Sequence, residues 1–241
     1  MAGFSFFGTV EGFGFGGVLK TRFARSSRRW SALSRSLSLG AFDMINPAFI
    51  SYPEEARLLG AMALGYGELD ISFTLAAGTA VDQKFALLHA VNQVRSESAR
   101  LDITHAIASG GFAKLGLAAE YARMHKAIRY CLKVRNQWAH SHWGDWGKDG
   151  LGFTRTDGDV FAQPMKPFKW NSITLPLLQK QEAFFEYTRQ CILTVTTNLT
   201  PILSGKPALV AMPPEMHEPS MHSQWSKQVH ARIETGPQPQ P

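Results

Sequence analysis

The residues of this chain whose types and spacing could support chemistry lie at the end of an amphipathic helical pattern, between Arg135 and His142. Upstream apolar positions recur every three or four residues, as on the buried face of a helix, and are Leu117, Tyr121, Met124, Ile128 and Cys131. The next position in this register is Arg135, and an arginine on a buried face needs groups that accept its hydrogen bonds. Asn136 and His140 follow one helical turn apart and share a face.

A guanidinium, an amide and two imidazoles at one helix end are suited to chemistry on a phosphate. An arginine presents a planar, permanently charged fork that matches two phosphate oxygens. A histidine titrates near neutral pH and can act as a general base or a general acid. We therefore take Arg135, Asn136 and His140 as candidate catalytic residues and His142 as a candidate neighbour at the same site.

Four long helices are expected to position these residues. The apolar periodicity predicts helices over about residues 53–77, 82–109, 112–142 and 174–203, with Gly110 and Gly111 ending the second one. Amphipathic helices of this length bury their apolar faces against one another. The sequence therefore predicts an all-α fold, a four-helix bundle.

A short β-structure is expected between the third and fourth helices. Glycines recur after the third helix, and β-prone runs at residues 151–154 and 160–163 flank an Asp-Gly turn at residues 156–159. An Asp-Gly pair between such runs is a strong hairpin signal. We therefore predict a small β-hairpin inserted before the last helix.

The two ends of the chain differ in composition from its middle. Residues 1–47 hold six basic and two acidic residues, so they supply a formal +4 of the net +6. Three interpretations stay open for them: a targeting peptide, a basic arm that contacts RNA phosphates, or translated upstream sequence with the true start at Met44. The sequence predicts disorder over 1–47, a helical domain over 48–205, and a disordered Pro-rich tail over 206–241.

The composition also limits the classes of protein to consider. No apolar run is long enough for a membrane helix, so no membrane partner is expected. Cys131 and Cys191 both fall inside helical patterns, which favours a reduced, cytoplasmic protein over a disulfide framework. The sequence contains no Gly-rich phosphate loop and no paired-cysteine or His-Glu metal motif, so we expect no cofactor and no metal.

Arg135-Asn136 followed by His140 resembles the characteristic site of the HEPN superfamily, whose members are small all-helical bundles. Arg100 and His105 have the same spacing, but Arg100 lies within a helix and is expected to be solvated. The resemblance covers about residues 51–205. It implies a metal-independent ribonuclease, often a toxin or defence effector, that acts on RNA as a symmetric homodimer and can be paired with an antitoxin. Many members have lost catalysis and only bind.

Helix geometry favours the homodimer. Five residues along an ideal helix turn through about 500°, so Arg135 and His140 point about 140° apart. A fraying helix end, or a twofold axis that joins two copies, would bring an arginine and a histidine to one phosphate. Cleavage would then proceed by attack of the RNA 2′-hydroxyl, with the histidine moving protons and the arginine balancing charge.

Two alternatives stay open. Arg135 could be structural, paired with Glu68 or Asp102 on neighbouring helices. Glu68, Asn92 and Arg95 are in addition candidate supporting or substrate-binding residues. The alternative function is a catalytically inactive module of the same shape that binds RNA, a nucleotide or a protein partner.

Overall fold

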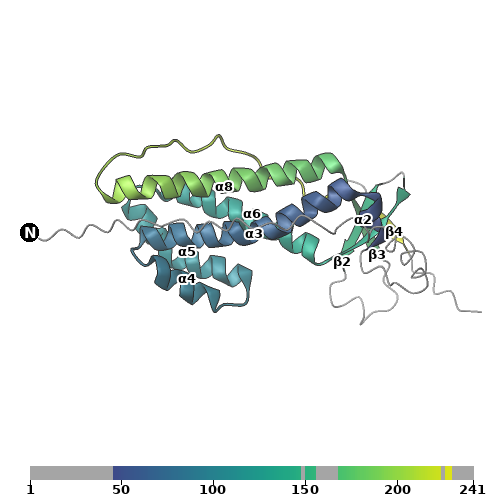
Figure 1. The fold of residues 1–241 in the computed structure, drawn as a ribbon, viewed down its shortest axis with the longest axis horizontal. Helices are drawn as coiled ribbons and strands as arrows, with labels where there is room; N and C mark the ends of the chain where they lie inside the picture. Colours follow the sequence, from purple (N-terminus) through teal and green to yellow (C-terminus); the bar gives the residue numbers. More distant parts are fainter. Residues whose placement is uncertain (1–45, 148–149, 156–167, 224–225, 230–241) are drawn as a thin grey trace, which may run out of the picture. The chain divides into compact units, whose positions relative to one another are not determined.

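Three long helices form the centre of the fold (Figure 1). The computed structural model describes residues 46–147, 150–155, 168–223 and 226–229. Its helices are α2 (Pro47–Ser51), α3 (Pro53–Ala80), α4 (Lys84–Asn92), α5 (Glu97–Lys114), α6 (Ala118–Ala139) and α8 (Leu175–Leu203). Its strands are β1 (Ser141–Asp145), β2 (Leu151–Arg155), β3 (Phe168–Ile173) and β4 (Ser226–Val229). Helix α8 packs against both α3 and α6, and α4 and α5 pack against α3.

The apolar face predicted for the third helix is buried in α6. Tyr121, Met124, Ile128 and Cys131 are all at most 3% exposed. They belong to one continuous cluster of buried apolar side chains that extends through α3, α5 and α8. The prediction of a predominantly helical protein is confirmed.

The predicted second helix is wrong in its extent, because the structure divides it into α4 and α5. Helix α5 starts after Ser96, whose hydroxyl accepts a hydrogen bond from the backbone N–H of Ala99 at 3.3 Å. A serine cap of this kind satisfies a backbone N–H that a helix start leaves without a partner. The break therefore has a local cause that the apolar periodicity does not reveal.

The glycines expected to end this helix lie inside α5. A Cβ at Gly111 would lie 3.0 Å from the carbonyl oxygen of Ala80, so this glycine permits close packing against the end of α3. The chain turns instead at Gly116, which has a φ of +73°, a conformation that favours glycine. Helix α6 then begins at Ala118.

Helix α6 ends at Ala139, earlier than predicted, and His140 is its C-terminal cap residue. The hydroxyl of Ser141 donates to the carbonyl oxygen of Gln137 at 2.6 Å, which satisfies a carbonyl in the last turn. Strand β1 starts at Ser141, so the prediction that His142 lies on the helix is wrong.

The small β-structure is an antiparallel sheet of strand order β1-β2-β3-β4. The predicted strand at residues 151–154 is confirmed as β2, but its neighbours are β1 and β3. Gly147 and Gly150 take positive φ values of +59° and +86° in the turn between β1 and β2. The other predicted strand, residues 160–163, lies outside the described residues.

Residues 206–223, which we call the strap, contradict the prediction of a disordered tail. The strap leaves the end of α8, runs back along α6 and α8, and leads toward β4, which pairs with β3 (Figure 1). On the N-terminal side, disorder is predicted through residue 47, whereas helix α2 already begins at Pro47. Residues 1–45, 224–225 and 230–241 lie outside the described residues, as do the predictions made for them.

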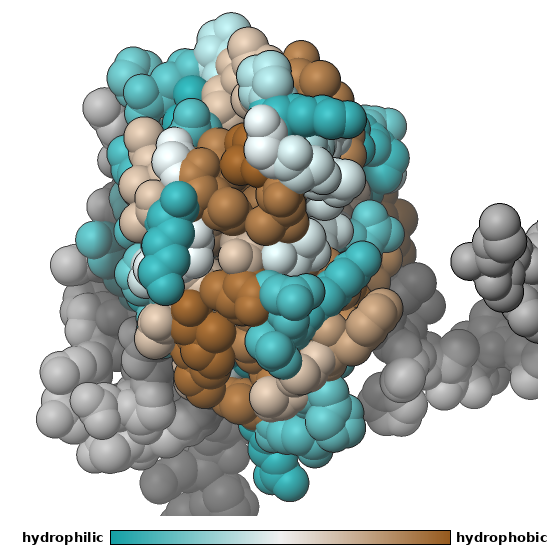
Figure 2. Space-filling model, turned by 90° about the vertical axis from the view of Figure 1, so that its left-hand side faces the viewer, coloured by the Kyte–Doolittle hydropathy of each residue, from teal (hydrophilic) through white to brown (hydrophobic). Residues whose placement is uncertain are grey.

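Several large apolar side chains remain exposed in the described part of the chain. Leu64, Phe85 and Leu209 are each at least 70% exposed. Apolar areas are visible between hydrophilic ones at the end of the helices farthest from the sheet (Figure 2). Among the described residues, none of the helices is long and apolar enough to cross a membrane.

Candidate functional site

Arg135 lies near the end of α6 and is held by an ion pair with Glu97. Its Nη1 atom lies 2.8 Å from Oε2 of Glu97 and donates to Oδ1 of Asn136 at 2.9 Å. The arginine side chain is 29% exposed. The prediction that Glu68 or Asp102 pairs with Arg135 is wrong, because the carboxylate that pairs with Arg135 belongs to Glu97. Glu97 was not predicted as this partner because the apolar periodicity predicts a longer helix around it. In the structure, Glu97 is the first residue of α5.

The two histidines of the motif lie on different elements. His140 is exposed at the end of α6, and its backbone N–H donates to the carbonyl oxygen of Asn136 at 3.3 Å. His142 is exposed on β1, opposite Thr154 in the β1–β2 register. The structure therefore keeps Asn136 and His140 adjacent on one helix end and places His142 in the sheet.

The three predicted supporting residues belong to other elements than Arg135. Glu68 belongs to α3 and lines a groove between α3 and α8. Asn92 is the last residue of α4, and Arg95 lies in the α4–α5 connection, both exposed. Within the described ranges, no hydrogen bond or ion pair links these three residues to the motif.

The residue of the motif that does line a hollow is Asn136. It belongs to an open groove of about 600 Å³, which we call the α6 groove. The groove residues on α6 are His125, Lys126, Arg129, Tyr130, Leu132, Lys133 and Asn136, joined by Ser98 of α5 and Glu218 of the strap. Three of them are cations at successive helical turns, a spacing that places them on one face. Apolar periodicity does not reveal this row, because the three cations lie on the polar face of the helix.

Two acidic groups lie beside the cations of the α6 groove. Arg129 forms an ion pair with Asp102, and both side chains are well exposed. Glu218 lines the groove from the strap. Pairs in this exposed setting contribute little to stability and are easily exchanged for another anion. Among the described residues, Lys126 and Lys133 form no ion pair with a carboxylate, so the groove presents positive charge toward solvent.

His125, at the edge of the α6 groove, is unsuited to proton transfer near neutral pH. Its ring stacks on His105 with centroids 4.3 Å apart, and it also faces Phe73 and Tyr121. Burial, with further contributions from His105 and Arg129, lowers the pKa of His125 to about 4. The side chain of His125 is therefore neutral at pH 7, and the exposed imidazole beside Asn136 is that of His140.

A second buried ion pair lies between α3 and α5. Arg100 donates from Nη1 to Oδ2 of Asp70 at 3.0 Å and from Nε to the carbonyl oxygen of Val94. Burial raises the pKa of Asp70, and the nearby Arg100 opposes that rise. The expectation that Arg100 is solvated is wrong, since it bridges α3 to the α4–α5 connection.

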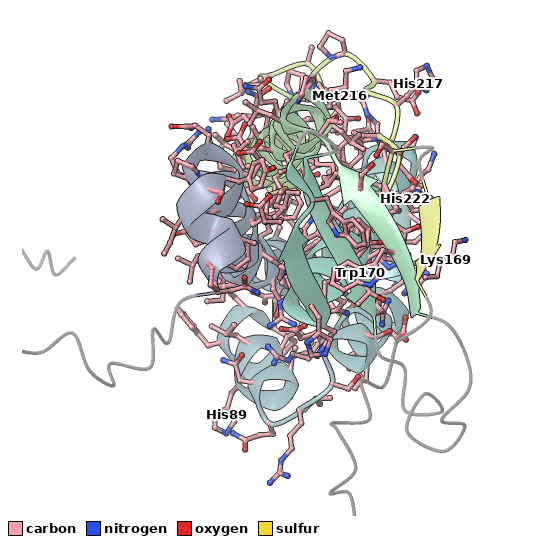
Figure 3. All side chains as sticks on the ribbon, turned by 90° about the vertical axis from the view of Figure 1, so that its right-hand side faces the viewer. His89, Lys169, Trp170, Met216, His217 and His222 are labelled. Atoms are coloured by element: carbon pink, nitrogen blue, oxygen red, sulfur yellow. The ribbon has the colours of Figure 1, made fainter. Side chains whose placement is uncertain are left out.

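The histidines show no arrangement typical of a metal site. Among the described residues, no group of three or more His, Cys, Asp or Glu side chains could hold a metal ion. Viewed from the sheet end, His89 lies on the opposite side of the molecule from His217 and His222 (Figure 3). Cys131 and Cys191 are both buried and reduced.

Comparison with known proteins gives no relative for this arrangement. No family model, no curated protein and no solved structure matches the chain.

Proposed function

We propose that this protein binds RNA, with the phosphate backbone lying along the α6 groove. The observation that carries the proposal is the row of Lys126, Arg129 and Lys133, which runs along one face of α6 and ends at Asn136. A positively charged groove of this kind follows a nucleic-acid backbone without reading its sequence. The amide of Asn136 adds a neutral donor beside the cations.

RNA cleavage without a metal is the second candidate function. It is favoured by His140, an exposed imidazole one helical turn beyond Asn136. Glu97 already balances the charge of Arg135, so cleavage in one copy lacks an arginine aimed at the phosphate of His140. In this proposal the chain is a HEPN-like bundle that acts as a cytoplasmic homodimer, with an antitoxin as its protein partner.

Binding is tested by fluorescence polarisation of a labelled single-stranded RNA with the full chain. The double variant Lys126→Ala/Lys133→Ala should weaken binding by about ten-fold and flatten the dependence on salt, by about 0.7 in the log-log slope for each lost phosphate contact. The matched control Lys114→Ala/Lys180→Ala removes the same charge from exposed positions outside the groove. Equal loss in both variants, or no binding by the parent, would contradict the proposed groove.

Cleavage is tested by incubating the full chain with total RNA in EDTA and analysing it on a denaturing gel. Products ending in 2′,3′-cyclic phosphate from the parent, lost in His140→Ala, would support the second function. Arg135→Ala should also remove activity, and its thermal unfolding must be measured because this change leaves Glu97 without its partner. Intact RNA with a folded parent would leave RNA binding as the function.

A further inference from the structure

A row of buried side chains between α6 and α8 binds the backbone of the strap. On α6, the hydroxyl of Tyr130 donates to the carbonyl oxygen of Pro219 at 2.9 Å, and Gln137 Nε2 donates to that of Met221 at 2.9 Å. On α8, Gln181 Nε2 donates to the carbonyl oxygen of Ser220 at 2.8 Å. These contacts are all made to main-chain carbonyls.

The far end of the row uses an asparagine and an arginine. Asn198 Nδ2 donates to the carbonyl oxygen of Val210 at 2.7 Å, and its Oδ1 accepts from the N–H groups of Leu209 and Val210 at 2.9 Å each. Arg123 donates from Nη2 to the carbonyl oxygen of Pro213. The donors on α6 recur at positions 123, 130 and 137, two helical turns apart each time, so they face one way.

The strap lies over a line of contacts between α6 and α8, which we call the α6–α8 groove. The side chains beneath the strap include aromatic rings. The rings of Tyr130 and Phe184 meet edge to face with centroids 4.6 Å apart, and Phe184 lies 5.3 Å from the ring of Tyr187. Arg123 lies over the ring of Tyr187 and donates from Nε to its hydroxyl at 2.7 Å. Burial raises the pKa of Tyr130, so its hydroxyl keeps the proton that it donates to the strap.

The strap has the conformation that such a groove suits. Between the contacts of Asn198 and Gln181, about ten strap residues cover the length of about seventeen helical residues, roughly 2.5 Å per residue. That rise exceeds the 1.5 Å or so of an α-helix and is below the 3.1 Å or so of a polyproline II helix, so the strap is an extended segment. Two of the carbonyls that the groove binds belong to Pro213 and Pro219.

We propose that the α6–α8 groove is a binding site for extended, proline-containing peptides, with the strap as its resident ligand and a proline-rich segment of a partner protein as the ligand that replaces it. Aromatic walls combined with donors to backbone carbonyls are the general means by which proteins bind polyproline II segments. The contacts of the strap do not involve the cations of the α6 groove, although Tyr130 of α6 and Glu218 of the strap also line that groove.

Exchange is favoured because hydrogen bonds, and little apolar burial, hold the strap in place. Its residues 206–211 and 214–218 are exposed, and Met212, Pro213, Pro219 and Met221 are half-buried. Segments with few buried apolar contacts open at low free-energy cost while the core stays folded. A competing peptide would replace the same backbone contacts, so the buried amides and hydroxyls of the groove would keep partners throughout.

The test uses a fluorescein-labelled peptide with the sequence of residues 207–221 and a chain of unchanged length in which residues 206–221 are replaced by Gly and Ser. Polarisation should rise to saturation with this chain. The parent chain should bind the peptide at least about ten-fold more weakly, because its own strap competes at high effective concentration. A peptide with alanine at its four prolines should bind several-fold more weakly, because it is no longer held in an extended conformation.

Two tyrosine variants of the Gly/Ser chain locate the binding. Tyr130→Phe should lower the affinity for the peptide about five-fold, which is the scale of one lost neutral hydrogen bond. Tyr52→Phe is the matched control, because its hydroxyl bonds to Asp145 and Gly147 instead. The proposal is overturned if the Gly/Ser chain unfolds, if it stays folded by circular dichroism but does not bind the peptide, or if both tyrosine variants bind equally.

Discussion

Helix α8 lies beside two grooves, and the described part of the chain fills one of them and leaves the other open. The α6–α8 groove holds the strap through Tyr130, Gln137, Gln181 and Asn198. The α3–α8 groove has a volume of about 500 Å³ and is lined mainly by apolar and small side chains, together with charged side chains of both signs. One helix therefore separates an occupied polar groove from an open apolar one.

The difference shows what decides whether a groove is covered by its own chain. Gln181 and Asn198 are almost completely buried, and a buried amide without a partner costs about 1–3 kcal/mol. The acids of the open groove, such as Glu68 and Glu182, are exposed and are satisfied by water. When the strap leaves the polar groove, water must replace it on these amides, whereas the acids of the apolar groove need no such replacement.

The largest expected effect distinguishes two neighbouring residues of α8. Gln181→Leu should lower the free energy of unfolding by about 2–4 kcal/mol, because Trp138 loses the acceptor of its indole N–H and the strap loses the donor to Ser220. Glu182→Leu, which faces the open groove, should change it by less than about 0.5 kcal/mol. Urea denaturation measures both. Similar losses in the two variants would contradict the distinction between the grooves.

A smaller effect is expected when one strap contact is removed. Tyr130→Phe should lower the free energy of unfolding by about 1 kcal/mol, since the Pro219 carbonyl loses its donor while the ring remains packed on Phe184. Hydrogen exchange of the amides of residues 220–223 should accelerate more than that of the α8 core. Uniform acceleration over the whole protein would show that the strap and the core open together.

The smallest effect, and one of opposite sign, is expected in the open groove. Gly65 lies within α3, and a Cβ added there meets no atom within 4 Å. Gly65→Ala should therefore raise the free energy of unfolding by about 0.5–1 kcal/mol, the usual helix-propensity difference. Gly78→Ala is the control, because its Cβ would lie 2.7 Å from the Cα of Lys84 and should destabilise the protein. A loss with Gly65→Ala in thermal denaturation would indicate that this groove is already occupied.

The sequence predicted those parts of the fold that depend on apolar periodicity. The buried face of α6 and the strand β2 follow from residue type and spacing. The division between α4 and α5 depends on one capping serine, Ser96, and on a turn that periodicity does not detect. Glu97 was missed as the partner of Arg135 for the same reason.

The strap was not predictable from its own composition, because Pro-rich segments without apolar periodicity are typical of disorder. Its order depends on side chains elsewhere in the chain. The available signal was the presence of Gln137, Gln181 and Asn198 on the buried faces of helices, where an amide needs a distant partner. The cations of α6 that line the α6 groove lie on the polar face of the helix, which a pattern of buried apolar residues does not reveal.

The path of the strap has a mechanical consequence. The strap brings the chain from the end of α8 back to the sheet, so that α2 and β4 lie at the same end of the molecule (Figure 1). A pulling force applied beyond β4 would first load the β3–β4 pairing and then the strap contacts in order, from Gln137 and Gln181 to Asn198. The extended length of the strap, at about 3.3–3.6 Å per residue, would be released before any helix of the core bears load.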